Sequence, residues 1–196
     1  MDIKRLIIVA VGGQGNLLAS KVLAEAAMLA NIPVRMSEIH GMAQRGGVVE
    51  SSLVFGDACS TIISDACADV LLAFEPAEAL RALGRCNSQT VVITNTAPMP
   101  PFTAAIGKGV YPPVDRIKAL LAEKTAKLVA VNANELATEA GSPLSVNMVL
   151  LGALIQTKVL PITPDTVKEA IAATVKKAFV DINLKAFELG FAAAGK

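Results

Sequence analysis

The chain has 196 residues, 53% of them hydrophobic and 18% charged, which is long enough to bury the core of one domain over residues 1–196. Its 18 Lys and Arg residues balance 17 Asp and Glu residues without a block of either sign, so the charge gives no reason to expect a nucleic-acid or membrane partner. The mean hydropathy of +0.54 is high for a monomer and favours buried interfaces with other protein chains.

The first predicted element is a buried strand at residues 6–11. Two basic residues precede it, as in a secretion signal, but the apolar run is short and ends in two glycines rather than in a small-residue cleavage site. The longest uncharged stretches, 86–107 and 140–157, are interrupted by polar residues and do not resemble the roughly 20 apolar residues that span a bilayer. We therefore expect a cytoplasmic protein.

Apolar runs of strand length alternate with segments of helical composition along the first two thirds of the chain. This pattern predicts a three-layer α/β/α, Rossmann-like domain with a mostly parallel sheet, followed by C-terminal helices. Most runs are apolar on both faces, as expected when helices cover both sides of a sheet. The predicted strands are residues 6–11, 34–39, 49–55, 70–74, 91–94 and 128–131.

The connections between these strands predict their directions. Residues 15–30 have helical composition, so the first two strands and this helix form a βαβ unit. Only about eight residues, 41–48, join the second and third strands, whereas a parallel crossover needs about a dozen or more. The third strand should therefore run antiparallel. Residues 96–113 contain five prolines and are predicted to form a long surface excursion.

Beyond Asn132 the pattern predicts helices only. One of them should begin at Thr163, where an N-cap residue is followed by Pro164 at the first helical position. Spacings of four residues predict that its buried face consists of Val167, Ile171 and Val175.

The sharpest local signal is a glycine turn, Gly12-Gly13-Gln14-Gly15, between a strand and a helix. Glycines permit positive φ and close approach of a ligand, and a helix N-terminus favours an anion. From Gly13 the pattern reads G-x-G-x-x-Leu18, so the third glycine of a dinucleotide-binding turn is missing, although Glu38 falls about where a ribose-binding acid would lie. A tight turn that binds nothing remains an equal alternative.

The second signal is the segment 37–47, which follows the second predicted strand. Because that end lies on the same edge of a parallel sheet as the glycine turn, both signals point to one ligand- or partner-facing edge. Together with the glycine turn, the candidate residues of this edge are Glu38, His40, Gln44, Arg45, Gly46 and Gly47.

Each candidate side chain also has a structural interpretation. His40 could act as a general acid or base, but we favour turn capping or backbone hydrogen bonding. Arg45 could bind a phosphate or carboxylate, or form a salt bridge to another subunit. Glu75 and Asn95 also follow strands, and for both we predict helix and turn capping. The sequence assigns no catalytic residue.

The chain offers little material for metal or independent redox chemistry. Its three cysteines, Cys59, Cys67 and Cys86, lack C-x-x-C spacing, and we expect them to be buried thiols. With one histidine in the chain we expect no metal site. Nucleophile elbows and phosphate loops with a Lys-Ser or Lys-Thr ending are also missing from the sequence.

Four segments in register carry a resemblance to a known family. They are V-G-G-Q-G (11–15), S-E-I-H-G-M-A-Q-R-G-G (37–47), A-D-V-L-L-A-F-E-P (68–76) and N-M-V-L-L-G-A-L (147–154). Together they resemble the gamma-type subunit or domain of 2-oxoacid:ferredoxin oxidoreductases over nearly the whole chain. The H-G-M-A-Q-R-G-G form is most similar to the beta subunit of the indolepyruvate enzyme, whereas pyruvate and 2-oxoglutarate relatives tend to carry Y-G-P-E-x-R-G-G.

The resemblance implies a complex that oxidatively decarboxylates an aryl or other 2-oxoacid to an acyl-CoA and passes electrons to ferredoxin. Thiamine diphosphate and iron–sulfur clusters would belong to a large partner subunit, with CoA bound in the complex and no cofactor on this chain. The isolated chain would be inactive and could form a homo-oligomer. The alternatives are a pyruvate or 2-oxoglutarate oxidoreductase gamma subunit, an independent dinucleotide-binding oxidoreductase, and a structural assembly subunit.

Overall fold

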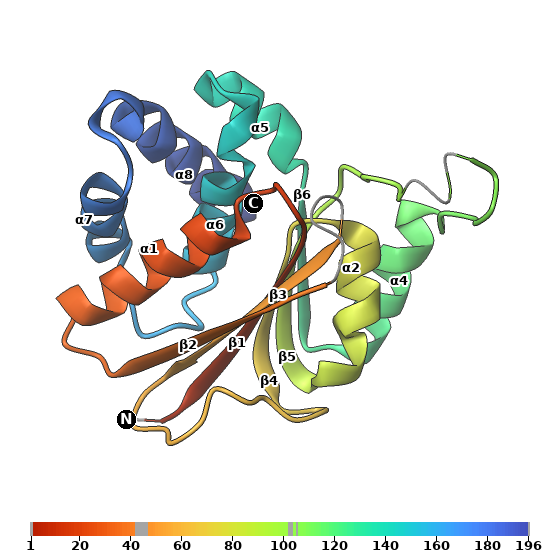
Figure 1. Cartoon of the computed structure of the whole chain (residues 1–196), viewed down its shortest axis with the longest axis horizontal. Coiled ribbons are helices and arrows are strands. Elements are labelled where there is room, and N and C mark those ends of the chain that lie inside the picture. The colour runs from red at the N-terminus through yellow and green to blue at the C-terminus, as the bar shows by residue number, and fades with distance from the viewer. Residues whose placement is uncertain (1, 42–46, 102–103, 105, 196) are drawn as a thin grey trace.

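A computed structural model describes residues 2–41, 47–101, 104 and 106–195. Helices separate β1 from β2, β4 from β5 and β5 from β6, while β2, β3 and β4 follow one another without a described helix, and helical elements follow β6 in the described part of the chain (Figure 1). In chain order the elements are β1 (Lys4–Val11), α1 (Asn16–Leu29), β2 (Val34–His40), β3 (Val48–Phe55), β4 (Ala68–Ala73), α2 (Pro76–Arg81), η1 (Ala82–Arg85), β5 (Cys86–Asn95), α4 (Val114–Lys124), β6 (Lys127–Val131), α5 (Ala133–Ala140), η2 (Pro143–Ser145), α6 (Val146–Gln156), α7 (Pro164–Thr174), η3 (Lys177–Phe179) and α8 (Val180–Ala194).

The six strands form one mixed sheet in the order β2-β3-β1-β4-β5-β6. β1, β4, β5 and β6 run parallel, and β3 runs antiparallel to both β1 and β2. The predicted strands, the antiparallel third strand and the α/β fold class are therefore confirmed. β1 and β2 point the same way with β3 between them, so their carboxyl ends lie at the same edge of the sheet.

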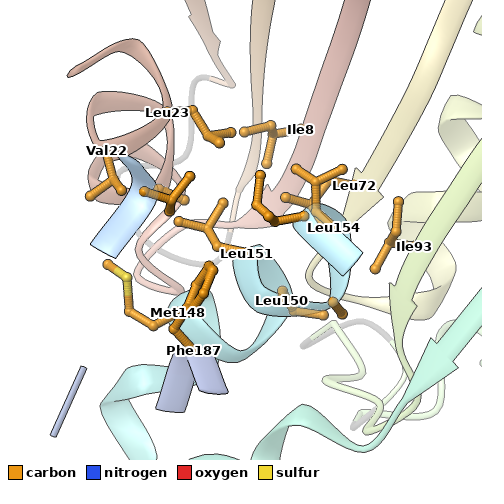
Figure 2. Packing of buried hydrophobic residues seen from close by; sticks show 14 of the residues in the cluster. Ile8, Val22, Leu23, Leu72, Ile93, Met148, Leu150, Leu151, Leu154 and Phe187 are labelled. Atoms are coloured by element: carbon orange, nitrogen blue, oxygen red, sulfur yellow. The ribbon is translucent and has the colours of Figure 1, made fainter. Parts of the chain in front are cut away.

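Helices cover both faces of this sheet. α1, α5, α6, α7 and α8 lie on one side, and α2 and α4 lie on the other (Figure 1). On the first side α6 is buried from Asn147 to Ile155, as expected of a helix that is apolar all round. Figure 2 shows its Leu151 and Leu154 packed between Leu23 of α1 and the strand residues Ile8 and Leu72.

α6 and α8 approach each other unusually closely. A Cβ atom on Gly152 would lie 2.0 Å from the carbonyl oxygen of Phe187, and one on Gly190 would lie 1.9 Å from that of Val149. Both obstructing atoms belong to backbone, which cannot rotate away. The two glycines therefore allow the helices to pack this closely. This packing gives a structural reason for the glycine, Gly152, of the N-M-V-L-L-G-A-L segment.

The predicted helix at Thr163 is confirmed, since the Thr163 side chain accepts a hydrogen bond from the N–H of Thr166 and Pro164 is the first helical residue. Val167 and Ile171 are buried as predicted, but α7 ends at Thr174 and Val175 is extended. The interpretation of Val175 as part of the helix face was wrong, although its side chain still packs against the core.

The excursion at residues 96–113 is largely exposed where the structure describes it, as predicted. The expectation of three buried thiols was wrong for two of them, because Cys59 and Cys67 lie exposed in the connection between β3 and β4, and only Cys86 is buried. Among the described helices, none is long and apolar enough to cross a membrane.

Candidate functional site

The glycine turn lies at the carboxyl end of β1 and begins α1. Gly13 and Gly15 have φ of +101° and +85°, which L side chains rarely adopt. A Cβ on Gly15 would also lie only 2.7 Å from Nδ2 of Asn147 at the start of α6. Gly15 is therefore required for the turn, and a side chain there would also displace the Asn147 side chain.

The turn and the segment after β2 meet at one edge of the sheet. The N–H of Gly12 donates a hydrogen bond to the carbonyl of Gly47 at 2.8 Å, and Gly41 N–H donates to Val48 O at 3.0 Å. The prediction that both signals share an edge is confirmed. The candidates Gln44, Arg45 and Gly46 lie outside the described residues.

Two side-chain amides link neighbouring strands at this edge through one carbonyl. Gln14 accepts a hydrogen bond from Val11 N–H at 2.8 Å and donates to Phe74 O at 3.3 Å. Asn95 donates to the same oxygen at 3.2 Å and accepts from the N–H groups of Ala97 and Ala133. The capping role predicted for Asn95 is confirmed, and the amide of Gln14 is likewise engaged in connecting β1 to β4.

His40 heads a chain of polar contacts that runs under α1. Its Nε2 lies 3.3 Å from Glu38 Oε2, and the other Glu38 oxygen accepts a hydrogen bond from Ser51 Oγ at 3.3 Å. The Ser51 hydroxyl lies 2.8 Å from Asn16 Oδ1, which also accepts from Ser20 at 3.1 Å. His40 is exposed, while Ser20, Ser51 and Asn16 are buried.

The His40 ring contacts the Glu38 carboxylate, and the turn capping or backbone hydrogen bonding predicted for it is not seen among the described residues. The Glu38 carboxylate is held by its neighbours His40 and Ser51, an arrangement that orients the imidazole at the sheet edge. Asn16, Ser20 and Ser51 were missed from the sequence. The signal that could have found them is that each is a polar residue on a face of a helix or strand that is otherwise apolar. In the sheet, Ser51 pairs with Ile8 of β1 on one side and with Glu38 of β2 on the other.

Glu75 is 1% exposed and caps α2, accepting the N–H of Glu78 at 3.0 Å, which confirms the predicted capping. It also accepts from Met99 N–H at 3.1 Å and from the Tyr111 hydroxyl, so one carboxylate holds both ends of the excursion. Burial, together with this hydrogen bond, raises the pKa of the Tyr111 phenol.

A polar cavity of about 300 Å³ lies between the start of β3 and the α2–η1 segment. Arg81 pairs with Glu78 at 2.8 Å, and Arg85 lies 3.7 Å from Glu50. Glu78 Oε2 is buried and has no hydrogen-bond partner among the residues that the structure describes, and burial raises the pKa of this carboxyl.

The donor set of the described residues does not assemble a metal centre. No group of three or more His, Cys, Asp or Glu side chains gathers among them. The pair of exposed His40 and half-buried Glu38 contributes two potential ligands, fewer than a structural zinc site requires.

The geometry defines a class of protein: a Rossmann-like α/β module with a mixed sheet, in which the glycine turn, Gly41 and Gly47 meet at one polar edge of the sheet. The profile of the pyruvate ferredoxin/flavodoxin oxidoreductase family matches residues 5–193. The chain belongs to this family.

Among members of the family, two similar proteins carry the same name. The indolepyruvate oxidoreductase subunit IorB of Methanothermobacter thermautotrophicus is 43% identical over 186 residues, covering 95% of each chain. The protein of the same name from Pyrococcus horikoshii is 42% identical over 191 residues, covering 96% of this chain and 95% of that one.

Solved structures agree in fold. The gamma subunit of a keto/oxoacid ferredoxin oxidoreductase from Geobacter sulfurreducens is 25% identical with a TM-score of 0.71, covering 97% of this chain and 98% of that one. The 2-oxoglutarate:ferredoxin oxidoreductase of Magnetococcus marinus, solved with 2-oxoglutarate, coenzyme A and succinyl-CoA, gives a TM-score of 0.75 at 20% identity. This chain is covered completely but spans only 31% of that longer chain.

Proposed function

We propose that this chain is the cofactor-free subunit of an indolepyruvate-type 2-oxoacid:ferredoxin oxidoreductase of the cytoplasm. The complex would cleave CO₂ from an aryl 2-oxoacid, join the remaining acyl group to the thiol of CoA, and pass the released electron pair to ferredoxin. The observation that carries the proposal is the 43% identity, over 95% of both chains, with a protein named indolepyruvate oxidoreductase subunit IorB.

The cysteine chemistry supports the assignment of the electron carriers to another subunit. An iron–sulfur cluster is held by about four thiolates, and this chain has three cysteines. Burial raises the pKa of the Cys86 thiol to about 11, which disfavours the thiolate form that a ligand needs. In the proposed complex a large subunit holds thiamine diphosphate and the clusters.

The polar edge would be the surface at which this subunit meets an anionic group or the large subunit. Gly13 and Gly15 leave backbone without side chains at the start of α1, where the helix dipole favours negative charge. His40 ends β2 at the same edge of the sheet, with its imidazole next to Glu38. A coenzyme A thioester, as bound by the Magnetococcus enzyme, has the anionic phosphates that such an edge would accept.

The test is reconstitution. We expect the purified chain to be colourless and to reduce no viologen dye with a 2-oxoacid, and we expect dye reduction to appear once it copurifies with a thiamine-dependent large subunit. Brown colour or turnover by the lone chain would contradict the proposal. Tight binding of NAD or flavin by the lone chain would favour an independent dinucleotide-binding oxidoreductase instead.

A further inference from the structure

A second cavity, of about 450 Å³ and open to solvent, is lined by the beginnings of α1, α6 and α8 and by the end of α7 with the residues that follow it. Its walls are largely apolar and come from segments far apart in the sequence. Leu144 and Phe179 are 85% and 54% exposed, which is unusual for side chains of this size. The apolar residues that line the cavity are Leu18, Leu144, Val175, Phe179 and Ile182.

Polar groups with spare hydrogen-bonding capacity face the same space. Ser145 is only 3% exposed, and its hydroxyl forms no hydrogen bond with another described residue. Asn183 is 8% exposed and donates through Nδ2 to the carbonyl of Phe179 at 2.8 Å, which leaves its Oδ1 as an acceptor. An apolar cavity of this size with a few convergent polar groups is typical of a small-molecule site.

The electrostatics of the cavity favour an anion. The first turns of α1, α6 and α8 line it through Leu18, Asn147 and Ile182, and none of these three helices has a side-chain cap. α2, α5 and α7 are each capped by a side chain, whereas α4, away from the cavity, is also uncapped. The first turn of α8 also carries Asp181, which offsets part of the positive end of that helix. The ammonium-bearing side chain of Lys176 lies at the same cavity. A carboxylate placed there would gain from the helix dipoles and from a charged donor.

We propose that this cavity binds a small aromatic carboxylate. The apolar body would lie against Leu18, Val175 and Ile182, and the carboxylate would accept hydrogen bonds from the Ser145 hydroxyl and from Lys176. A single cation and mainly apolar walls suit one carboxylate better than a polyphosphate. The carboxylate and the apolar body follow from the cavity, while the choice of an aryl body rests on the proposed function.

The experiment is a calorimetric titration of the purified full chain with indole-3-acetate, indole and hexanoate. Indole-3-acetate should bind at one site and at least about tenfold more tightly than indole, which lacks the charge. Lys176→Gln should weaken indole-3-acetate binding by about tenfold, and Ser145→Ala should weaken it severalfold. Lys177→Gln is the matched control, because Lys177 is an exposed neighbour that does not line the cavity.

No saturable binding of indole-3-acetate, or equal losses in the Lys176 and Lys177 variants, would overturn the inference. Hexanoate binding as tightly as indole-3-acetate would overturn the aromatic specificity. Loss of indole-3-acetate binding when the large subunit assembles would assign the cavity to a subunit contact and also overturn it. A chain that binds no indole-3-acetate yet supports 2-oxoacid-dependent dye reduction would refute this inference alone, whereas a chain that binds it but never assembles would refute the proposed function alone.

Discussion

Replacing Gly152 by alanine should force α6 and α8 apart. The added Cβ would lie 2.0 Å from the Phe187 carbonyl oxygen and 2.7 Å from the Phe191 nitrogen, whereas ordinary contact begins at 3.4 Å. Both neighbours are backbone atoms of α8, so the helices must separate by about 1.4 Å or the chain must distort locally. The packing around Phe187, which lies in the core beside Met148 (Figure 2), would be lost in part.

The change in the free energy of unfolding is the difference between two opposing effects. Overpacking of a core costs about 3 kcal/mol at the upper end of its usual range, and the backbone obstruction places this site there. Replacing Gly by Ala inside a helix returns about 1 kcal/mol of helix propensity. The net loss in the free energy of unfolding is about 2 kcal/mol, which for a chain of this size lowers Tm by roughly 4–8 °C.

Chemical denaturation and calorimetry of the isolated chain measure this loss. Gly84→Ala is the matched control, because no atom lies within 4 Å of the Cβ that would be added there, and we expect its Tm to change little. Gly190→Ala should behave like Gly152→Ala, and the double variant should lose less than the sum because one separation relieves both clashes. A Gly152→Ala protein as stable as the parent would refute the close-crossing argument.

Three further expectations concern charge and thiol chemistry. Burial raises the folded pKa of Glu78 above its ordinary 4.5, so its contribution to stability is present below that pH and is lost as pH rises through the raised value. The stability of Glu78→Gln relative to the parent should therefore improve from pH 4 to pH 7 in denaturant titrations, and an unchanged difference would contradict the assignment. Ellman's reagent should label Cys59 and Cys67 rapidly in the isolated chain and Cys86 only on unfolding. Burial raises the pKa of the Cys86 thiol to about 11 from 9.0, which lowers its thiolate fraction about a hundredfold. Three equally fast thiols would show that Cys86 is accessible. Arg45→Ala should lower the free energy of unfolding of the lone subunit by only roughly 0.5 kcal/mol, and yet weaken complex formation or raise KM for CoA or the 2-oxoacid. A variant that unfolds alone, or that assembles and turns over like the parent, would exclude a role of Arg45 in assembly or in binding an anionic group.

Local sequence patterns were sufficient to predict the strands, the direction of β3 and two of the helix caps. Apolar runs predicted every strand of the sheet, and the short connection at 41–48 predicted that β3 runs antiparallel, because too few residues are present for a crossover. Thr163 and Glu75 were predicted as caps, since capping depends on neighbours within about three residues. The four family segments were likewise readable without coordinates.

Contacts between distant segments were decided only by the tertiary structure. The pairing of Ser51 with Asn16 joins residues 35 positions apart, and its distance depends on the register of β3 and the placement of α1. Exposure of Cys59 and Cys67 follows from the path of the β3–β4 connection, which composition does not reveal.

The cavity beside Ser145 exists because the ends of three helices converge, and no local pattern specifies that meeting. The sequence by itself thus determined the elements, their directions and the family, because these depend on periodicity and short-range chemistry. Which polar groups share a cavity or a hydrogen bond was decided by packing, because one helix shift changes all of those distances together.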